Sequence, residues 1–312
     1  MLNILIFKIL SLAAIMAAGF LLVRWGPLTS QDTRSLSRIN CWLIMPCSIF
    51  GAFQISRSPE ILKGLAMVLL AAVLVHCLYI LLSSVLRKPL HMQPVEQASV
   101  FCTNAGNLII PLVTAILGKE WVIFTCAYIL VQTVLLWSYV KNLVCGERGI
   151  AWKQLLTNPN ILALALGCAL FLLNLRLPRL LEDTVSSIGS MVGPSSMLVI
   201  GMTIAGAEGK QILKEKRVWL VTALRLIAYP LLCLLLLKAL CLLFPDAAPY
   251  FLITMMAASA PSAAVITHIC QLYGRDPRQA SAICTVTTVL CTLTIPLMIV
   301  LYTLASGMEA LS

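Results

Sequence analysis

The sequence predicts an all-helical integral membrane protein with about ten transmembrane helices in two inverted five-helix repeats. The first observation is composition: of 312 residues, 60% are hydrophobic and only 11% are charged, too few charges to cover the surface of a soluble domain. The second is that the apolar residues form long, separate stretches. The third is that two stretches contain Asn, Gly, Ser or Pro near their middle, which predicts broken helices 4 and 9 crossing at the membrane midplane.

The predicted spans follow from length, because a bilayer core of ~30 Å needs about 20 apolar residues at ~1.5 Å each. The first span has neither the basic start nor the small-residue cleavage site of a secretory signal, so we expect it to be retained as a helix. The connections carry turn residues, such as Arg-Lys-Pro at 87–89. In chain order, the spans are residues 4–23, 38–55, 61–86, 95–117, 121–141, 159–175, 184–206, 218–243, 249–272 and 279–305.

The distribution of Lys and Arg predicts the orientation. The connections after helices 1, 3, 5, 7 and 9 hold 14 of these residues, and those on the other side hold five. Because basic connections stay in the cytoplasm, we expect a multi-pass protein of the cell inner membrane with both termini outside the cytoplasm. Membrane lipids are therefore expected partners.

Composition argues against several other classes of protein. The net charge of +10 could suggest nucleic-acid binding, but the basic residues lie in connections without interleaved aromatic residues, so no nucleic-acid partner is expected. The twelve cysteines include no Cys-x-x-Cys pair and no Cys/His cluster with zinc spacing, so no metal site is expected. An enzyme would need a nucleophile with its base, or a metal cluster, within the spans. The sequence offers neither convincingly, so we predict no enzymatic activity and no cofactor.

Two short motifs recur along the chain. Pro46-Cys47-Ser48 in helix 2 is matched 148 residues later by Pro194-Ser195-Ser196 in helix 7. Gly118-Lys119-Glu120 after helix 4 is matched 156 residues later by Gly274-Arg275-Asp276 after helix 9. Motifs that recur in the same order indicate an internal duplication.

The duplication predicts one five-helix repeat over residues 1–145 and a second over residues 155–312. Five is an odd number of helices, so the second repeat must be inverted in the membrane. Inverted repeats with discontinuous helices are a recurring plan of transporters.

Predicted helix 4 contains Asn104, Gly106, Asn107 and Pro111 in the middle of its span. Proline removes an amide donor, glycine lets another backbone approach, and asparagine brings polar atoms that need partners in lipid. Freed backbone at this depth must be covered by protein or by a water-filled cavity. We therefore expect these four residues to bind substrate.

Predicted helix 9 has a similar interruption at Ser259, Pro261 and Ser262, and we expect these residues to form the other half of the substrate site. The half-helix N-termini there would present free amides and the positive end of a dipole, which favour an anion. The alternative is that Pro111 and Pro261 only kink two packed helices. Their matching positions in the two repeats favour a site.

Three further polar residues are candidates. Arg225 lies well inside a span, where arginine is costly and a functional candidate, although snorkelling to the headgroups is an equal alternative. Gln132 on helix 5 would bind substrate through a neutral hydrogen bond or would simply join two helices. His268 lies two turns beyond Pro261 and would couple transport to protons or ions, or be a satisfied core histidine.

Acidic residues are missing from the middle of every predicted span. Proton-coupled carriers commonly relay protons through buried carboxylates. Any coupling would therefore use His, Na⁺ bound to neutral oxygens, or the membrane potential acting on an anion. A polar site without acids predicts a small organic anion as substrate.

These residues resemble the auxin efflux carrier family, which includes bacterial malate and malonate permeases. Asn104-x-Gly106 followed by Pro111-Leu112 is similar to the family's Asn-x-Gly-x-x-Gly-x-Pro-Leu motif, with Ile109 in place of the second glycine. Ile188-Gly189 through Gly201 is similar to its helix 7 signature, and Ala260 through Gly274 to its helix 9. The resemblance covers nearly the whole chain.

The resemblance implies a scaffold of helices 1, 2, 6 and 7, a transport part of helices 3–5 and 8–10, elevator-type alternating access, and often a homodimer. With the acid-free interior, it predicts a secondary-active or facilitative transporter of mono- or dicarboxylates such as malate, or of auxin-like weak acids. The alternatives are an exporter of amino acids or other neutral or cationic metabolites, and a Na⁺-coupled bile-acid-type symporter.

Overall fold

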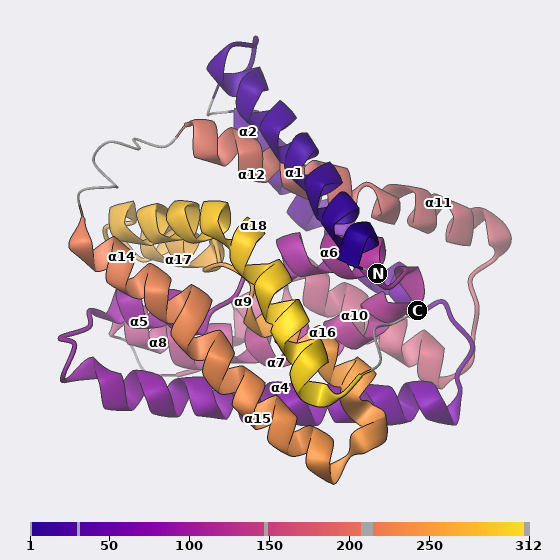
Figure 1. Ribbon diagram of the computed structural model, residues 1–312. Coiled ribbons are helices and arrows are strands. Elements are labelled where there is room, and N and C mark those ends of the chain that lie inside the picture. The colour runs from indigo at the N-terminus through magenta and orange to yellow at the C-terminus, as the bar shows by residue number, and fades with distance from the viewer. Residues whose placement is uncertain (1, 30–31, 147–148, 207–214, 309–312) are drawn as a thin grey trace. The chain divides into compact units, whose positions relative to one another are not determined.

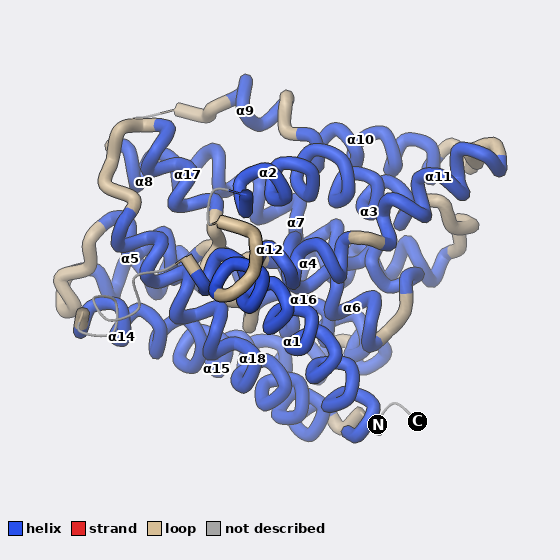
Figure 2. The backbone as a smooth tube through the Cα atoms, turned by 90° about the horizontal axis from the view of Figure 1, so that it is seen from above, coloured by secondary structure: helices blue, strands red, loops and turns tan. Residues whose placement is uncertain are grey.

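The computed structural model describes residues 2–29, 32–146, 149–206 and 215–308. It is all-helical, with 82% helix and no strand among the described residues, as Figure 2 shows. The chain packs as two compact units, each assembled from three separate stretches of sequence. Unit 1 takes its described residues from 1–66, 106–130 and 153–206, and unit 2 takes its from 67–105, 131–152 and 207–312. Both predicted repeats contribute to both units.

Each unit has its own set of helices, and a few elements belong to both. Unit 1 contains α1 (Leu2–Arg24), α2 (Asp32–Ile39), the π-helical turn η1 (Asn40–Ile44), α3 (Met45–Ala52), α6 (Ile110–Ile116), the 3-10 turn η3 (Lys119–Trp121), α10 (Pro159–Leu172), α11 (Arg179–Ser190) and α12 (Val192–Ala205). Unit 2 contains α5 (Pro94–Phe101), the π-helical turn η4 (Leu136–Val140), α8 (Lys141–Cys145), α14 (Lys216–Ala223), the π-helical turn η5 (Leu224–Ala228), α15 (Tyr229–Leu243), the 3-10 turn η6 (Pro245–Ala247), α16 (Ala248–Ala258), α17 (Val265–Leu272) and α18 (Arg278–Ser306). Four elements run from one unit into the other: α4 (Pro59–Arg87), the π-helical turn η2 (Ala105–Ile109), α7 (Val122–Leu135) and α9 (Trp152–Leu156).

Local sequence explains where many helices begin and end. Pro94 and Pro159 stand at the first positions of α5 and α10, where a missing amide hydrogen costs nothing. Asn158 caps α10, because its side-chain oxygen accepts a hydrogen bond from the Asn160 amide at 2.9 Å. Gly146 ends α8 and Gly307 ends α18 with φ of 74° and 65°, a conformation that glycine adopts without strain.

Five helical stretches are long and apolar enough to cross a membrane. They coincide with the predicted spans 61–86, 121–141, 184–206, 218–243 and 279–305, so this part of the prediction is confirmed. Other predicted spans lie on shorter apolar helices, and the total of ten with its inverted repeat stays a prediction. The five stretches are Pro59–Arg87, Lys119–Cys145, Arg179–Ala205, Lys216–Leu243 and Arg278–Ser306.

In unit 1, α1 and α12 pack backbone against backbone (Figure 1). Gly19 of α1 lies against the backbone of Leu198, and Gly201 of α12 lies against the backbone of Met16. Neither position has room for a Cβ atom. Small residues at such a contact let membrane helices approach closely and gain van der Waals packing.

In unit 2, α5 and α16 are the central helices. Every residue of α5 from Glu96 to Phe101 is buried, and so is every residue of α16 from Phe251 to Ala258. A helix that is buried on all faces belongs to the core rather than to an amphipathic surface. Both helices therefore end where their last backbone carbonyls are enclosed by protein.

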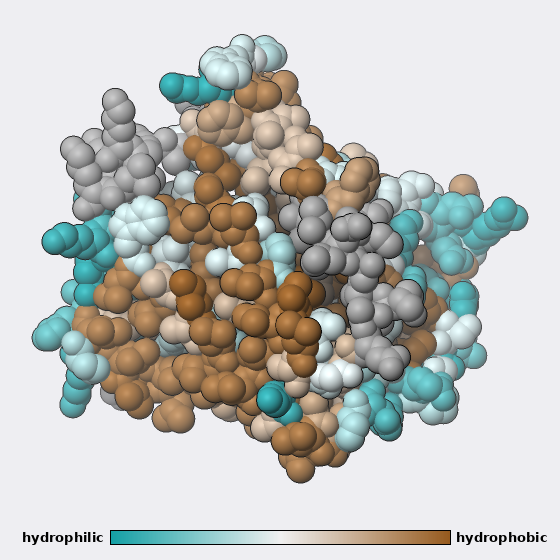
Figure 3. All heavy atoms as spheres, in the orientation of Figure 1, coloured by the Kyte–Doolittle hydropathy of each residue, from teal (hydrophilic) through white to brown (hydrophobic). Residues whose placement is uncertain are grey.

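One face of unit 2 is apolar. Figure 3 shows a largely hydrophobic surface over α15 and α18. Leu235 and Leu242 of α15 are 62% and 78% exposed, and Leu293 of α18 is 73% exposed. Exposed leucines spread along two long helices are unfavourable in water and are expected for side chains that face lipid.

Candidate functional site

Two short extended segments meet inside unit 2, and we call them the crossing pair: residues 102–104 after α5 and residues 261–263 after α16. The Asn104 amide donates to the Pro261 carbonyl at 2.8 Å, and the Ala263 amide donates to the Cys102 carbonyl at 3.0 Å. Thr103 and Ser262 thus face each other in an isolated antiparallel bridge. The pairing satisfies backbone groups that would otherwise be left free at the ends of two buried helices.

Gln132 of α7 completes the outer edge of the crossing pair. Its Oε1 accepts from the Thr103 amide at 3.1 Å and from Thr103 Oγ1 at 2.6 Å, and its Nε2 donates to the Thr103 carbonyl at 2.7 Å. A side-chain amide carries one acceptor and one donor group, so it can occupy the position of a neighbouring strand. Both polar groups of the Gln132 side chain are therefore hydrogen-bonded to Thr103, including its backbone.

The second segment has its own side-chain partner. The Ser262 amide donates to Oγ1 of Thr287, a buried residue of α18, at 3.1 Å. Ser259, just before the segment, is also buried, and its hydroxyl donates to the Met255 carbonyl at 2.8 Å. Ser262 Oγ is fully buried and has no hydrogen-bond partner among the described residues.

Arg225, in the π-helical turn η5, reaches the same region. Its Nε donates to the Ala260 carbonyl at 2.9 Å, its Nη1 to the Val100 carbonyl at 3.0 Å, and its Nη2 to the Ala258 carbonyl at 2.7 Å. The side chain is 0% exposed. This enclosed position differs from the snorkelling alternative, which would bring the guanidinium to the surface.

The sequence also matches a known protein family. The family model described as "Membrane transport protein" matches residues 4–149 and 148–299. The chain belongs to this membrane transport protein family. The match confirms the resemblance to auxin efflux carriers seen in the sequence. None of the curated proteins matches the chain significantly.

The other predicted helix 4 residues of this membrane transport protein lie in unit 1. Gly106 and Asn107 are in η2, and Pro111 is in the first turn of α6. Asn107 Oδ1 accepts a long hydrogen bond of 3.4 Å from Asn40 Nδ2. The predicted site residues are thus divided: Asn104, Gln132, Arg225, Ser259, Pro261 and Ser262 lie in unit 2, and Gly106, Asn107 and Pro111 lie in unit 1.

Asn40 is a polar residue that the sequence analysis did not select. It is buried at the start of η1. Its Nδ2 donates to Ser196 Oγ at 2.9 Å, and its Oδ1 accepts from Ser195 Oγ at 3.0 Å. The Pro-Ser-Ser motif of predicted helix 7 therefore supplies hydroxyl partners to a buried amide within unit 1.

His268 lies outside the crossing pair. It is on α17, and its side chain is exposed. His76 of α4 is buried instead, with Nδ1 2.7 Å from the Ala72 carbonyl and its ring 5.5 Å from that of Phe101. The role of His268 in proton or ion coupling stays a prediction.

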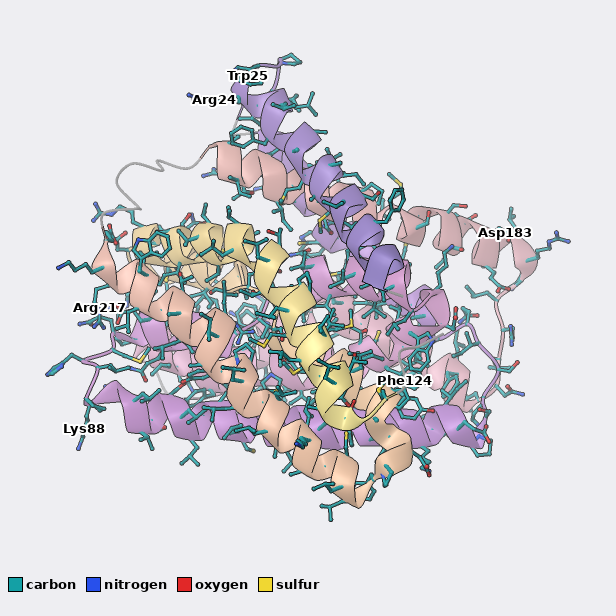
Figure 4. The ribbon with its side chains drawn as sticks, viewed as in Figure 1. Arg24, Trp25, Lys88, Phe124, Asp183 and Arg217 are labelled. Atoms are coloured by element: carbon teal, nitrogen blue, oxygen red, sulfur yellow. The ribbon has the colours of Figure 1, made fainter. Side chains whose placement is uncertain are left out.

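Glu96 is a buried acid whose importance the sequence analysis missed. It is the third residue of α5, its side chain is 0% exposed, and it forms an ion pair with Arg217. Figure 4 marks Arg217 at the start of α14. Arg217 Nε and Gln279 Nε2 each donate to Glu96 Oε1 at 2.8 Å. The carboxylate is therefore neutralised, and it lies at the beginning of α5 rather than at the crossing pair.

The exposed loop after α17 carries a second charged pair. Arg278 donates from its side chain and its backbone to Asp276. The side-chain hydrogen bond from Arg278 is the main cause that lowers the pKa of Asp276 to about 2. The loop thus keeps both charges over the physiological pH range.

Proposed function

We propose that this protein is a secondary-active or facilitative transporter of small organic anions, with the crossing pair as its substrate site. Membership of a membrane transport family supports a transporter. The observation that carries the site is the extended backbone of residues 102–104 and 261–263 between two buried helix ends. Interrupted helices of this kind form substrate sites in secondary transporters, because their free ends can bind ions and polar groups.

The sign of the substrate charge is argued from the surroundings of the crossing pair. None of residues 102–104 and 259–264 is acidic. α17 begins at Val265, directly after the second segment, so the positive end of its dipole lies next to the pair. These two features favour a carboxylate over a cation.

The proposal includes an architecture. α5 with α6 would form the broken helix 4, and α16 with α17 the broken helix 9, of ten spans in two inverted repeats. The chain would lie in the cell inner membrane with both termini outside the cytoplasm, as a homodimer. The transport part, helices 3–5 and 8–10, would move relative to the scaffold of helices 1, 2, 6 and 7 in an elevator-type cycle.

A ligand-stabilisation screen tests the substrate class. Purified protein is melted with carboxylates, amino acids, cationic amines and bile-acid-type anions, with and without Na⁺ and at several pH values. A ligand at 100 times its Kd stabilises by about 2.7 kcal/mol. We expect a small carboxylate to raise the Tm, to lose this effect in Asn104→Ala, and to keep it in Asn142→Ala, a matched control on α8 in the same unit.

Other outcomes of the screen would contradict the proposal. Stabilisation by amino acids or cationic amines alone would support an exporter of neutral or cationic metabolites. Stabilisation by a bile-acid-type anion only in the presence of Na⁺ would support a symporter of that class.

A carboxylate effect that depends on Na⁺ or pH would instead agree with the proposal and would identify the coupling ion of the proposed carrier.

A further inference from the structure

The guanidinium of Arg225 has almost no donor left for a ligand. Arginine has five N–H groups. Nε donates to Ala260 O, Nη1 donates to Val100 O, and Nη2 donates to both Ala258 O and Ala260 O at 2.7 Å. Four of the five N–H groups are therefore used by three backbone carbonyls.

The carbonyls that Arg225 binds belong to two helix C-termini. Val100 lies in the last turn of α5, Ala258 is the last residue of α16, and Ala260 is two residues beyond it. Each helix C-terminus carries about −0.5 of an elementary charge. Two such ends balance one guanidinium, which explains how a full charge is kept inside unit 2 with no carboxylate of the described residues at hydrogen-bond distance.

The planar shape of arginine matters for this contact. Its fork reaches carbonyls from two different helices at once, whereas a lysine ammonium is a single point charge. The ring of Tyr79 lies 5.8 Å from Arg225 Cζ, and the Tyr79 hydroxyl donates to the same Ala258 carbonyl at 3.4 Å. Arg225 is thus fixed on several sides.

We propose that Arg225 is a positioning residue that caps α5 and α16 together and so keeps the crossing pair in register, and that it is not the counter-ion of the substrate. The proposal rests on the proposed function only in taking the crossing pair as the transport site. Without the cap, the ends of α5 and α16 lose their shared donor. The hydrogen bonds between Asn104 and Pro261 and between Ala263 and Cys102 then open more often.

Hydrogen exchange and transport kinetics together test this role. Arg225→Lys keeps the charge and removes the fork, and Lys238→Met removes an exposed charge from α15 as a matched control. In Arg225→Lys we expect amide exchange in residues 100–106 and 260–266 to rise about tenfold or more, as local opening becomes easier. Carboxylate uptake should lose Vmax by about tenfold while KM stays within about threefold. The reason is that the substitution affects the geometry of the transport step rather than the initial binding of substrate. Lys238→Met should leave the exchange and both kinetic parameters unchanged.

Two results would overturn the proposal. One is unchanged exchange of both segments in Arg225→Lys. The other is a KM raised about tenfold with Vmax retained, which is the signature of lost substrate contact. The exchange measurement needs no substrate, so it decides the positioning role even if no carboxylate is transported and the proposed function fails.

Discussion

The side-chain amide of Gln132 is hydrogen-bonded to both backbone groups of Thr103, accepting from its amide at 3.1 Å and donating to its carbonyl at 2.7 Å. A glutamine in a helix thereby takes the place of a strand beside an extended segment. This contact satisfies both backbone groups of Thr103 where residues 102–104 leave the helical conformation inside an apolar core.

Substitution of Gln132 tests the importance of this contact. Gln132→Leu keeps the side-chain size but removes all three hydrogen bonds to Thr103, and an unsatisfied buried backbone group costs about 1–3 kcal/mol. We expect a lower Tm and a loss of transport of about tenfold. Ser138→Ala, which removes only an exposed bond from Ser138 Oγ to the Val134 carbonyl, is the control. A Gln132→Leu protein with wild-type Tm and flux would contradict this account.

The backbone contact between α1 and α12 predicts a strict requirement for glycine. In Gly201→Ala, the new Cβ would collide with the backbone of Met16, which cannot move aside as a flexible side chain would. We expect about 1–3 kcal/mol of destabilisation, seen as a lower Tm. Gly193 lies on the same helix, where a Cβ would meet Pro111 Cβ at an ordinary 3.8 Å. Equal Tm values for Gly201→Ala and Gly193→Ala would refute the close packing.

The buried polar cluster of unit 1 makes a third prediction. Asn40→Ala removes a hydrogen-bond partner from Ser195 Oγ and from Ser196 Oγ, which are buried; among the described residues, Ser195 Oγ then keeps only a long bond of 3.4 Å to the Val192 carbonyl. We expect a loss of about 1–3 kcal/mol, measured by thermal unfolding. Thr203→Ala, on exposed α12 surface with a bond only to the Val199 carbonyl, should change the Tm little. A larger effect from Thr203→Ala than from Asn40→Ala would show that the cluster contributes nothing.

Replacing Arg217 should destabilise the protein more than replacing Glu96, its partner in the ion pair. Glu96 is fully buried, whereas the Arg217 side chain is 39% exposed. Arg217→Met therefore leaves a buried carboxylate without its counter-charge, at a cost of about 3 kcal/mol or more, while in Glu96→Gln the guanidinium can be hydrated. We expect the Tm to fall more in Arg217→Met than in Glu96→Gln. Arg179→Met breaks an exposed pair with Asp183 and should leave the Tm almost unchanged. If Arg179→Met and Arg217→Met had the same Tm, the argument would be contradicted.

Some of the candidate site could be predicted from the sequence because Asn, Gly and Pro interrupt otherwise apolar spans. This signal selected Asn104, Pro261 and Ser262, all of which belong to the crossing pair. The pairing of Thr103 with Ser262 joins residues that are far apart in the chain, and no local pattern encodes such a contact. The partner of Gln132 was left open for the same reason.

Burial was the other quantity that the sequence could not provide. Glu96 stands near the beginning of a span, where an exposed connection and a buried ion pair look alike in sequence. Arg225 could equally have snorkelled, because helical periodicity gives the face of a residue and not its depth. Asn40 was missed because a single amide near the start of an apolar stretch is indistinguishable from a helix end.

The most direct test of the central claim is carboxylate flux into liposomes that contain only this protein. We predict saturable uptake of a small labelled carboxylate such as malate, competed by other carboxylates and not by cationic amines. Asn104→Ala should reduce the flux about tenfold or more, as expected for lost site geometry, and Asn142→Ala should leave it intact. Absence of flux for every carboxylate, or equal flux from wild type and Asn104→Ala, would contradict the crossing pair as an anion transport site.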